Sequence, residues 1–364
     1  MKKKVLFVFG TRPEAIKLYP LILLFKEKGA FDVVVVNSGQ QKEMLDQTIE
    51  SLKIPVDFDL SVMTVNQSLA VLSSNLFTKL DQLYSNMRPN YLFIHGDTTT
   101  SMVAGILGKY HKIKTFHVEA GLRSHNIYSP WPEEMNRKVN AITADYNLAP
   151  TEDAMKNLIS EGIKANNILV TGNTGIDALR LIIQNKKNDS NIIGLDSNLI
   201  LITIHRRENF DKLKEIFSAI QTIAESNLEF NFLYPVHLNP NVRSLAYEML
   251  SENDNLKLVD PLEYKEFIFL LEKSYFVITD SGGIQEEATY LGKPIVLCRD
   301  TTERPEGLNT QNIILAGTKR DSIVKYSNSL INDKIFYQKS SVPSMIFGNG
   351  YASEIIYKFL CELE

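Results

Sequence analysis

The sequence predicts an α/β fold in which the same parallel-sheet architecture occurs twice. Short apolar runs, rich in β-branched and aromatic residues, alternate with amphipathic stretches along the whole chain. The pattern restarts near residue 198, after a glycine-containing segment, although no sequence repeat accompanies it. With 364 residues, of which 44% are hydrophobic, the chain is long enough to build more than one domain core.

Buried parallel strands are expected at regular intervals in the first half. They are VLFVFG (5–10), DVVVVN (32–37), YLFIHG (91–96), KTFHVE (114–119) and YNLAP (146–150). Helical patterns separate them, as in PEAIKLYPLILLFKEKG, where Pro13 suits the first turn and Gly29 suits the C-terminal cap. This alternation is typical of βαβ units in an open sheet.

A second set of strands follows and defines the predicted domains. It consists of NLILITIH (198–205), FNFLYPV (230–236), YFVITD (275–280) and KPIVLC (293–298). We place one joint near VTGNTGIDAL (170–179) and a return crossover near FGNG (347–350). The predicted Rossmann-like domains are residues 1–170 with the helix 350–364, and residues 171–349. Two such domains imply a cleft between them, and ligands of open α/β sheets bind beyond the carboxyl ends of the strands.

Composition and charge exclude several classes of function. The net charge of −4 and the pI near 6 argue against a nucleic-acid partner, which would require an excess of basic residues. The apolar run after the lysines at 2–4 has six residues, too few for a signal peptide or a membrane span. Cys298 and Cys361 cannot form a disulfide framework or a zinc cluster. We therefore expect a cytoplasmic protein with no metal and no membrane partner.

Glycine-containing loops follow two of the predicted strands. In GTRPEAIK (10–17), Gly10 permits a tight turn, and Arg12 and Lys17 add positive charge to a helix N-terminus that can bind an anion. The spacing is not that of a Walker A loop, and the alternative is a capped helix with solvated charges. In TDSGGIQEEA (279–288), backbone N–H groups and a hydroxyl can hold a phosphate. The residues concerned are Ser281, Gly282 and Gly283.

The acidic residues and a histidine also cluster after strands. Asp97 and Glu119 end two strands of the first half, and Glu133 and Glu134 begin a helix after Pro132. Either glutamate alone could be an ordinary dipole partner of that helix. Three carboxylates from adjacent loops, however, have their pKa values raised by mutual repulsion, which is how catalytic acids and bases arise. His205 stands beside two arginines, where it is either structural or faces a diphosphate.

Taken together, the motifs resemble one family. GTRPEAIK, HGDTTT, HVEAGLRS, SPWPEEMNR, HRREN, DSGGIQEEA and RDTTERPEG occur in this order from Lys4 to the last helix. The series resembles that of the non-hydrolysing UDP-N-acetylglucosamine 2-epimerases of bacteria. The resemblance implies a glycosyltransferase-B fold, a homodimer and no cofactor. The reaction implied is the interconversion of UDP-GlcNAc and UDP-ManNAc, through elimination of UDP to 2-acetamidoglucal and re-addition, which supplies ManNAc for surface polysaccharide.

The resemblance also implies roles for individual residues. Asp97, Glu119 and Glu133 would share the acid, base and oxocarbenium-stabilising work, and His205 would face the leaving diphosphate. The substrate-binding set would be Arg12, Lys17, Arg137, Arg304, Ser281, Gly282 and Gly283 for phosphate or sugar oxygens, Glu287 for the ribose hydroxyls and Phe267 for uracil. For Phe267 the alternative is an ordinary core position of an amphipathic helix, and for Glu287 a charge that complements the helix dipole.

The chain departs from this family at an activating subsite. Many members are activated by a second substrate molecule, and their GQH segment helps to form its site. Here the segment reads SGQQKEM (38–44), so that Gln41 replaces the histidine, while Gln40 and His237 remain. Asn66 replaces a basic residue. We expect turnover of UDP-ManNAc without added UDP-GlcNAc. Other readings of the chain are a glycosyltransferase of the same fold, a hydrolysing epimerase that releases ManNAc and UDP, and an inactive sugar-nucleotide sensor.

Overall fold

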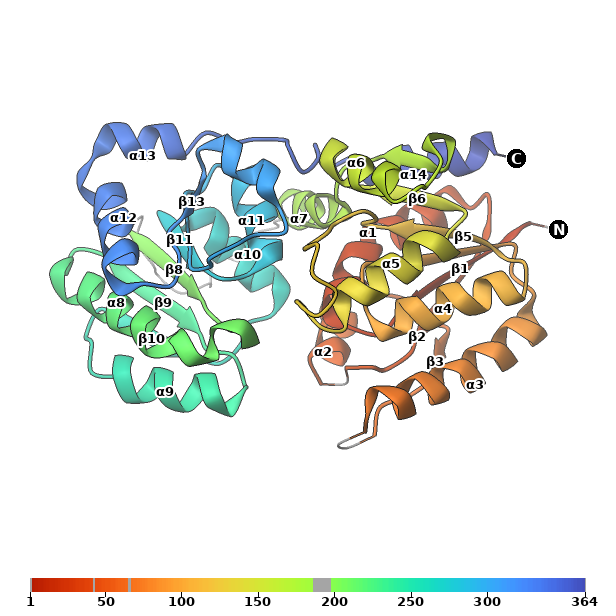
Figure 1. The fold of residues 1–364 in the computed structure, drawn as a ribbon, viewed down its shortest axis with the longest axis horizontal. Helices are drawn as coiled ribbons and strands as arrows, with labels where there is room; N and C mark the ends of the chain where they lie inside the picture. Colours follow the sequence, from red (N-terminus) through yellow and green to blue (C-terminus); the bar gives the residue numbers. More distant parts are fainter. Residues whose placement is uncertain (1, 42, 65–66, 186–197, 364) are drawn as a thin grey trace. The chain divides into compact units, whose positions relative to one another are not determined.

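The computed structural model describes residues 2–41, 43–64, 67–185 and 198–363, which form two compact units (Figure 1). Unit 1 contains Met1–Leu181 and Gly348–Glu364, and unit 2 contains Ile182–Phe347. Contacts thus divide the chain after Leu181 rather than after residue 170. The assignment of independent domains stays a prediction, because a compact unit need not fold on its own.

Unit 1 is built on a parallel sheet of seven strands. The strands lie in the order β3-β2-β1-β4-β5-β6-β7. Their bounds are β1 Lys4–Phe9, β2 Asp32–Asn37, β3 Phe58–Asp59, β4 Tyr91–His95, β5 Lys114–Val118, β6 Tyr146–Ala149 and β7 Ile168–Val170. The predicted strands of the first half are confirmed, and β1, β4, β5 and β6 are largely buried because helices cover both faces of a parallel sheet.

Helices connect these strands as expected. They are α1 Arg12–Lys28, α2 Glu43–Leu52, α3 Leu69–Met87, α4 Thr99–Tyr110, α5 Glu133–Thr143, α6 Glu152–Ser160, α7 Thr174–Gln184 and α14 Ala352–Glu362, with a 3-10 turn at Ala165–Asn167. Helix α1 shows the predicted signals, with Pro13 in its first turn and Gly29 as a left-handed cap at φ 64°. A capping box between Thr11 and Glu14 fixes its start, which the sequence analysis did not use.

Aromatic side chains fill the side of the sheet on which α14 lies. Phe93 stacks between Phe7 and Phe116 at centroid distances of 4.9 and 4.8 Å. The ring of Tyr357 meets Phe25 edge-on at 4.9 Å, which docks α14 against α1. In Figure 1 this blue C-terminal helix accordingly lies among the elements of unit 1. The C-terminal segment therefore completes the core of the unit that the N-terminal strand begins.

Unit 2 repeats the architecture with a parallel sheet of six strands. The order is β10-β9-β8-β11-β12-β13. The strands are β8 Leu199–Thr203, β9 Asn231–Pro235, β10 Leu256–Val259, β11 Phe276–Thr279, β12 Ile295–Leu297 and β13 Ile313–Leu315. The helices are α8 Leu213–Ser226, α9 Pro240–Leu250, α10 Tyr264–Lys273, α11 Gly282–Tyr290, α12 Arg320–Asn332 and α13 Lys334–Ser340, with 3-10 helices at Arg207–Lys212 and Pro305–Thr310. All four predicted strands of the second half are confirmed.

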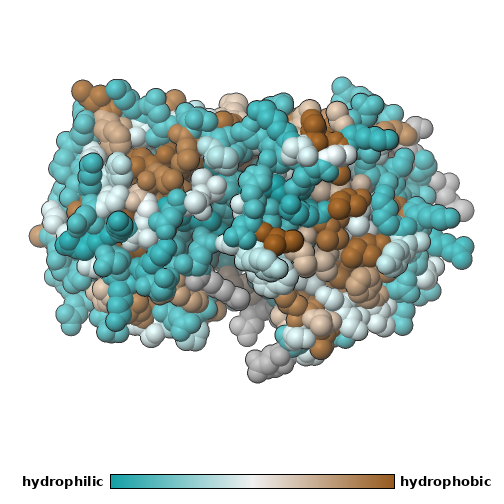
Figure 2. Space-filling model, viewed as in Figure 1, coloured by the Kyte–Doolittle hydropathy of each residue, from teal (hydrophilic) through white to brown (hydrophobic). Residues whose placement is uncertain are grey.

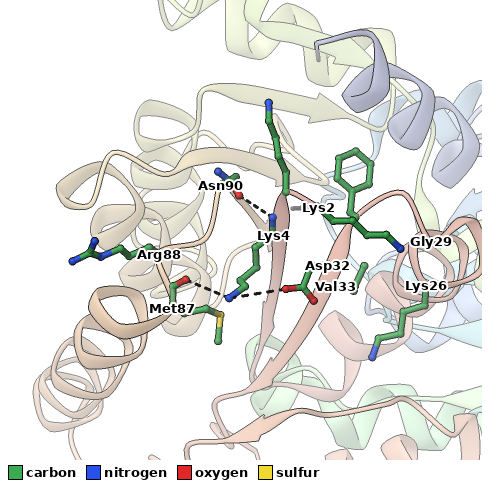
Figure 3. A pocket seen from close by; sticks show the side chains of 11 residues that line it. Lys2, Lys4, Lys26, Gly29, Asp32, Val33, Met87, Arg88 and Asn90 are labelled. Carbon is green, nitrogen blue, oxygen red and sulfur yellow. Dashed lines mark hydrogen bonds and ion pairs between the residues drawn. The ribbon is translucent and has the colours of Figure 1, made fainter.

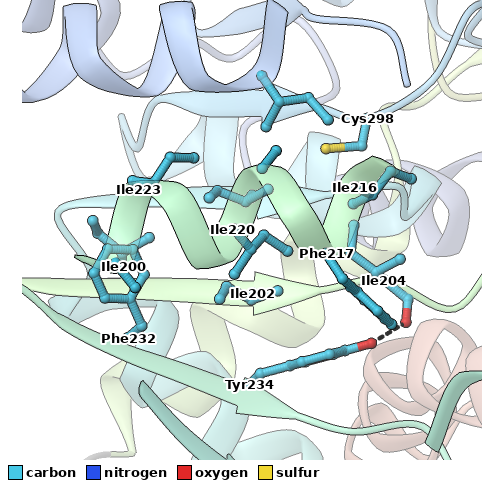
Figure 4. Packing of buried hydrophobic residues seen from close by; sticks show 14 of the residues in the cluster. Ile200, Ile202, Ile204, Ile216, Phe217, Ile220, Ile223, Phe232, Tyr234 and Cys298 are labelled. Atoms are coloured by element: carbon cyan, nitrogen blue, oxygen red, sulfur yellow. Dashed lines mark hydrogen bonds between the residues drawn. The ribbon is translucent and has the colours of Figure 1, made fainter. Parts of the chain in front are cut away.

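The core of unit 2 lies between α8 and its sheet, as Figure 4 shows. Ile216, Ile220 and Ile223 recur at helical spacing on α8 and pack over strands β8 and β9. Tyr234 is fully buried, and its hydroxyl donates a hydrogen bond of 2.6 Å to the carbonyl oxygen of Ile204. This bond satisfies the buried phenol and holds the chain where it leaves β8 toward His205.

Four strands were not predicted, and all four lie at sheet edges. They are β3, β7, β10 and β13. β3 is exposed and β7 is partly exposed, and β10 and β13 each begin with one buried residue followed by partly or fully exposed ones, in contrast to the fully buried β4 and β8. An edge strand pairs on one side only and can remain short, and apolar stretches as short as ILV and IIL are not recognisable as strands in the sequence.

The surface carries scattered apolar residues. On the face in Figure 2, hydrophobic residues form several small groups separated by hydrophilic ones. Exposed apolar side chains include Leu69 and Val71 on α3 and Ile142 on α5. Single residues of this kind are usual on soluble domains. Within the described part of the chain, no helix is both long and apolar enough to cross a membrane.

Candidate active site

Each sheet places some of the predicted site residues at its topological switch point. In unit 1 the strand order reverses between β1 and β4, and in unit 2 between β8 and β11. The connections from such neighbouring strands run to opposite faces, which leaves a crevice at their carboxyl ends. Arg12 follows β1 and Asp97 follows β4, whereas His205 follows β8 and Ser281 follows β11. The polar loops therefore lie where this fold forms ligand sites.

Asp97 is held by an arginine from α5. Its carboxylate accepts a hydrogen bond of 2.6 Å from Nη2 of Arg137, and its backbone carbonyl accepts one of 2.8 Å from Asn136. The other terminal nitrogen of Arg137 donates to Oε2 of Glu134 at 3.1 Å. Glu134 is fully buried, so its charge fixes the arginine. The structure thus brings Asp97 and Arg137 together, with Arg137 bridging two carboxylates.

Glu119 is paired with a lysine from α1. Oε2 of Glu119 accepts a short hydrogen bond from Nζ of Lys17 and one of 2.6 Å from Asn173. Its φ of 63° is left-handed, which is uncommon for glutamate and is typical of strained positions at functional sites. Nε2 of His95 lies 3.9 Å from the same oxygen. Burial lowers the pKa of His95 to about 4 despite this carboxylate, so the imidazole is neutral near pH 7.

Glu133 opens helix α5, where it is partly buried, and its catalytic role stays a prediction. Its neighbour Glu134 was given only a dipole role, yet it is the buried acid that anchors Arg137. The spacing of three residues between Glu134 and Arg137 on one helix could have indicated this pair.

The two glutamines of the SGQQKEM segment bind helix N-termini of unit 1. Oε1 of Gln40 accepts hydrogen bonds from the backbone and the hydroxyl of Thr100 at 3.1 and 2.8 Å. Oε1 of Gln41 accepts one of 3.3 Å from the backbone N–H of Arg12. Gly10 lies beneath them, and a Cβ there would meet Oγ of Ser38 at 2.1 Å. Both glutamines therefore have local structural partners, and Asn66 lies outside the described residues.

In unit 2 a fully buried aspartate holds the turn that carries His205. The carboxylate of Asp280 accepts hydrogen bonds from the backbone N–H groups of His205 and Arg206, at 2.9 to 3.2 Å. It accepts a third from Nδ2 of Asn209 at 3.0 Å. Nδ1 of His205 lies 3.6 Å from Asp280, and its ring stacks on His237 at a centroid distance of 5.5 Å. Burial lowers the pKa of His205, and His237 adds to this effect while Asp280 opposes it.

Two guanidinium groups lie against the N-terminus of helix α11. A Cβ on Gly282 would be 2.5 Å from Nη1 of Arg304 and 2.9 Å from Nη2 of Arg206. Arg206 donates to Glu303 at 3.0 Å, and Nε of Arg304 forms a short bond with Glu286. Burial by itself raises the pKa of Glu303, but the charges of Arg206, Arg304 and Arg299 hold it well below its usual range. The result is a pre-arranged cationic site at a helix N-terminus, which suits a phosphate.

The remaining predicted ligands of unit 2 surround this helix. Ser281 is the residue before α11, and a Cβ on Gly283 would meet no heavy atom within 4 Å. Glu287 accepts a hydrogen bond of 2.6 Å from the hydroxyl of Tyr264. Phe267 on α10 is partly exposed and is not among the buried core residues. Their contacts with a nucleotide stay predictions.

Sequence reasoning missed several residues that organise the site. Asp280, Arg206, Glu14 and Glu303 lie within the motifs, but their structural contacts were not predicted, and Glu286 was expected only to complement the helix dipole. Asp280 and Arg206 stand at the end of a predicted strand or directly after it, and that position is a signal that could have identified them. The sequence could not show that the acids among them are buried, which is what makes them anchors rather than solvated charges.

A basic depression of about 870 Å³ lies at the opposite end of the unit 1 sheet (Figure 3). Its lining includes Lys2, Lys3, Lys4, Lys26 and Arg88. Helices α1 and α3 end here, at left-handed caps. Because helix C-termini attract cations, this charge is explained without a ligand. Among the described residues, no group of three or more His, Cys, Asp or Glu side chains could hold a metal ion.

Comparison with known proteins identifies the structural class and the family of the chain. Two parallel α/β units with these strand orders define the glycosyltransferase-B-like class, and the similar solved structures have that fold. The sequence model described as UDP-N-acetylglucosamine 2-epimerase matches residues 24–361. A Bacillus subtilis UDP-N-acetylglucosamine 2-epimerase is 44% identical over 364 residues, covering 99% of this chain and 96% of the relative.

Solved structures agree with the sequence comparison. UDP-GlcNAc 2-epimerase from Neisseria meningitidis, bound to UDP-GlcNAc, is 41% identical with a TM-score of 0.94 and covers 99% of this chain and 100% of its own. The S. aureus MnaA structure with UDP is 37% identical with a TM-score of 0.91, covering 100% and 97%. The chain belongs to the UDP-N-acetylglucosamine 2-epimerase family, whose members are isomerases.

Proposed function

We propose that this protein interconverts UDP-GlcNAc and UDP-ManNAc without releasing a free sugar. Support comes from family membership and from similar structures that contain UDP-GlcNAc or UDP. The observation that carries the proposal is the pairing of the two loop carboxylates, Asp97 with Arg137 and Glu119 with Lys17, at the carboxyl edge of one sheet. Paired, preorganised carboxylates are what proton transfer at a sugar carbon requires.

The chemistry explains why several acids are needed. The C2 proton of UDP-GlcNAc is not adjacent to a carbonyl, so removing it alone is very unfavourable. A base can take this proton while the bond from C1 to the diphosphate oxygen breaks. The electron pair of the C2–H bond then forms the C1–C2 double bond, and the pair of the C1–O bond leaves with UDP. The product is 2-acetamidoglucal. Re-addition of UDP at C1, with protonation of C2 from the other face, gives UDP-ManNAc.

Unit 1 would supply the proton transfers in this scheme. Asp97, Glu119 and Glu133 together would act as base, as acid and in stabilising positive charge at C1, with no fixed division of these roles among them. Lys17 and Arg137 then have a second role beyond contact with sugar or phosphate oxygens, because each neutralises a carboxylate before substrate arrives. Arg12, on the loop after β1, is assigned to phosphate.

Unit 2 would hold UDP. Arg304 and Arg206 at Gly282 are suited to stabilise the charge that develops on the departing diphosphate. His205 would face the same oxygens, and the stack with His237 orients its ring. Ser281 and Gly283 are assigned to phosphate, Glu287 to the ribose and Phe267 to uracil. We further propose a cytoplasmic homodimer that supplies ManNAc for surface polysaccharide.

We also propose that UDP-ManNAc is turned over without activation by added UDP-GlcNAc. Gln41 replaces the usual histidine, and its side-chain oxygen accepts from the backbone of Arg12, which supports a structural rather than a ligand-binding role. A reverse-direction assay with UDP-ManNAc alone is expected to show turnover from the first time point. A strict requirement for UDP-GlcNAc would refute this proposal.

Incubation with UDP-GlcNAc in D₂O, followed by NMR, tests the main proposal. Epimerisation predicts deuterium at C2 and intact UDP-ManNAc. A hydrolysing enzyme would instead release free ManNAc. A glycosyltransferase without acceptor, or a sensor, would show no exchange at C2, and either result would overturn the assignment.

A further inference from the structure

Glu14 is a buried carboxylate that the scheme above does not use. It stands in the first turn of α1, is 2% exposed and belongs to the GTRPEAIK loop. Its Oε2 accepts hydrogen bonds of 2.9 Å from the backbone N–H groups of Gly10 and Thr11 and from the Thr11 hydroxyl. A carboxylate placed there satisfies the free N–H groups where the chain leaves β1.

The second oxygen of Glu14 reaches a different loop. Oε1 accepts a hydrogen bond of 2.6 Å from the hydroxyl of Thr98. That hydroxyl also caps α4, because it accepts from the backbone N–H of Ser101 at 3.0 Å. Thr98 directly follows Asp97. Glu14 therefore joins the loop of Arg12 to the loop of Asp97, across the switch point between β1 and β4.

We propose that Glu14 is the positioning residue of Asp97, which it fixes through Thr98 and on which its own negative charge acts. The inference rests on the proposed function for the role of Asp97. Arg137 contacts the carboxylate of Asp97 directly, whereas Glu14 contacts the next residue, Thr98, so that a cation and an anion both act on this loop. Such competing neighbours adjust how readily an acid gives up its proton.

The electrostatics of the site agree with this geometry. Burial raises the pKa of Glu14 to about 7, the hydrogen bonds from Thr98, Gly10 and Thr11 oppose that rise, and the charge of Asp97 adds to it. The titratable group that faces Glu14 from the β4–α4 loop is Asp97, and Arg12 and Lys17 are the charged residues near it on α1. Interaction between two groups is mutual, so the charge of Glu14 acts on Asp97 equally.

Two substitutions act on the link and on the charge in different ways. Glu14→Gln keeps the shape and removes the charge, whereas Thr98→Val keeps the carboxyl but removes a hydrogen bond that lowers its pKa, so the pKa of Glu14 should rise. Both are expected to lower turnover by at least about tenfold with KM changed little, because a misplaced acid slows the chemical step. The step in the pH profile of C2 exchange near pH 7, where Glu14 ionises, should vanish in Glu14→Gln and should move to higher pH by at least about half a unit in Thr98→Val.

Matched controls exist in the same unit. Asp177→Asn also neutralises a buried carboxylate that accepts backbone N–H groups, at Ala352 and Ser353, and Thr151→Val also removes a threonine cap, from α6. Each should lower the melting temperature without changing C2 exchange per folded molecule. Wild-type turnover and an unmoved pH midpoint in both Glu14→Gln and Thr98→Val would overturn the proposal.

A stability cycle provides a readout that needs no activity. The cycle compares the unfolding equilibrium constants of wild type, Glu14→Gln, Asp97→Asn and the double variant. The effects of the two substitutions on this constant should be coupled by at least about threefold at pH 8, and by less at pH 5, where Glu14 is protonated. If wild type shows no C2 exchange, the proposed function fails, while this cycle still decides whether the two charges interact. If Glu14→Gln does not fold, Thr98→Val takes its place in the cycle. Additive effects of the two substitutions on unfolding at both pH values would overturn the link.

Discussion

Gly282 and Gly283 allow the proposed phosphate site to be tested by two neighbouring substitutions with different expected results. A methyl group on Gly283 meets no heavy atom within 4 Å, so Gly283→Ala should fold normally. Its stability should stay the same or rise by up to about 1 kcal/mol, because alanine is the better helix former. A phosphate at this helix N-terminus would meet that methyl group, and we expect UDP affinity to fall about tenfold, or about 1.4 kcal/mol.

Gly282→Ala should instead damage the protein before any ligand binds. Its Cβ would lie 2.5 Å from Arg304 and 2.9 Å from Arg206, closer than carbon and nitrogen approach without a shift. Both guanidinium groups are anchored to buried glutamates, so moving them should destabilise the protein by about 1–3 kcal/mol.

Thermal unfolding without ligand and calorimetric titration with UDP distinguish these outcomes. Gly283→Ala is expected to lose UDP affinity at an unchanged melting temperature, and Gly282→Ala to lose both. Wild-type UDP affinity in Gly283→Ala would show that the diphosphate does not occupy the N-terminus of α11, and the phosphate assignments of Ser281 and Gly283 would be wrong.

Two further predictions concern unit 1. Asp97→Asn, Glu119→Gln and Glu133→Gln should each lower turnover by about 10²-fold or more, because acid–base groups contribute on this scale, while UDP binding stays nearly intact. Near-native turnover in all three variants would refute their roles. Burial lowers the pKa of His117 from 6.5 to about 4, so the unfolded chain binds the extra proton and stability is lost as pH falls from about 6.5 to 4. The loss amounts to at most about 3 kcal/mol. Denaturant titrations at pH 7 and pH 4.5 should show a smaller loss for His117→Gln than for wild type.

The sequence determined the architecture of the central elements. A strand covered on both faces is mostly apolar, so the central strands could be recognised in the sequence, and the polar residues after them had to gather at one edge of each sheet. Local signals at Pro13 and Gly29 gave the bounds of α1. The edge strands β3, β7, β10 and β13 escaped prediction because they are only two to four residues long, too short for a recognisable pattern.

The tertiary structure alone decided which charges work together. Glu133 and Glu134 are adjacent and chemically identical, yet the fold buries Glu134 against Arg137. In the sequence, Asp97 is only an acidic residue at the end of an apolar run. The sequence predicts its position at the edge of the sheet but not the residues that pair with it. Arg137 comes from a helix 40 residues later, and the hydroxyl of Thr98 leads to Glu14 from 84 residues earlier. Residue identity fixes the chemistry that is possible, whereas burial and pairing depend on contacts between distant segments, and these set the charge of each group.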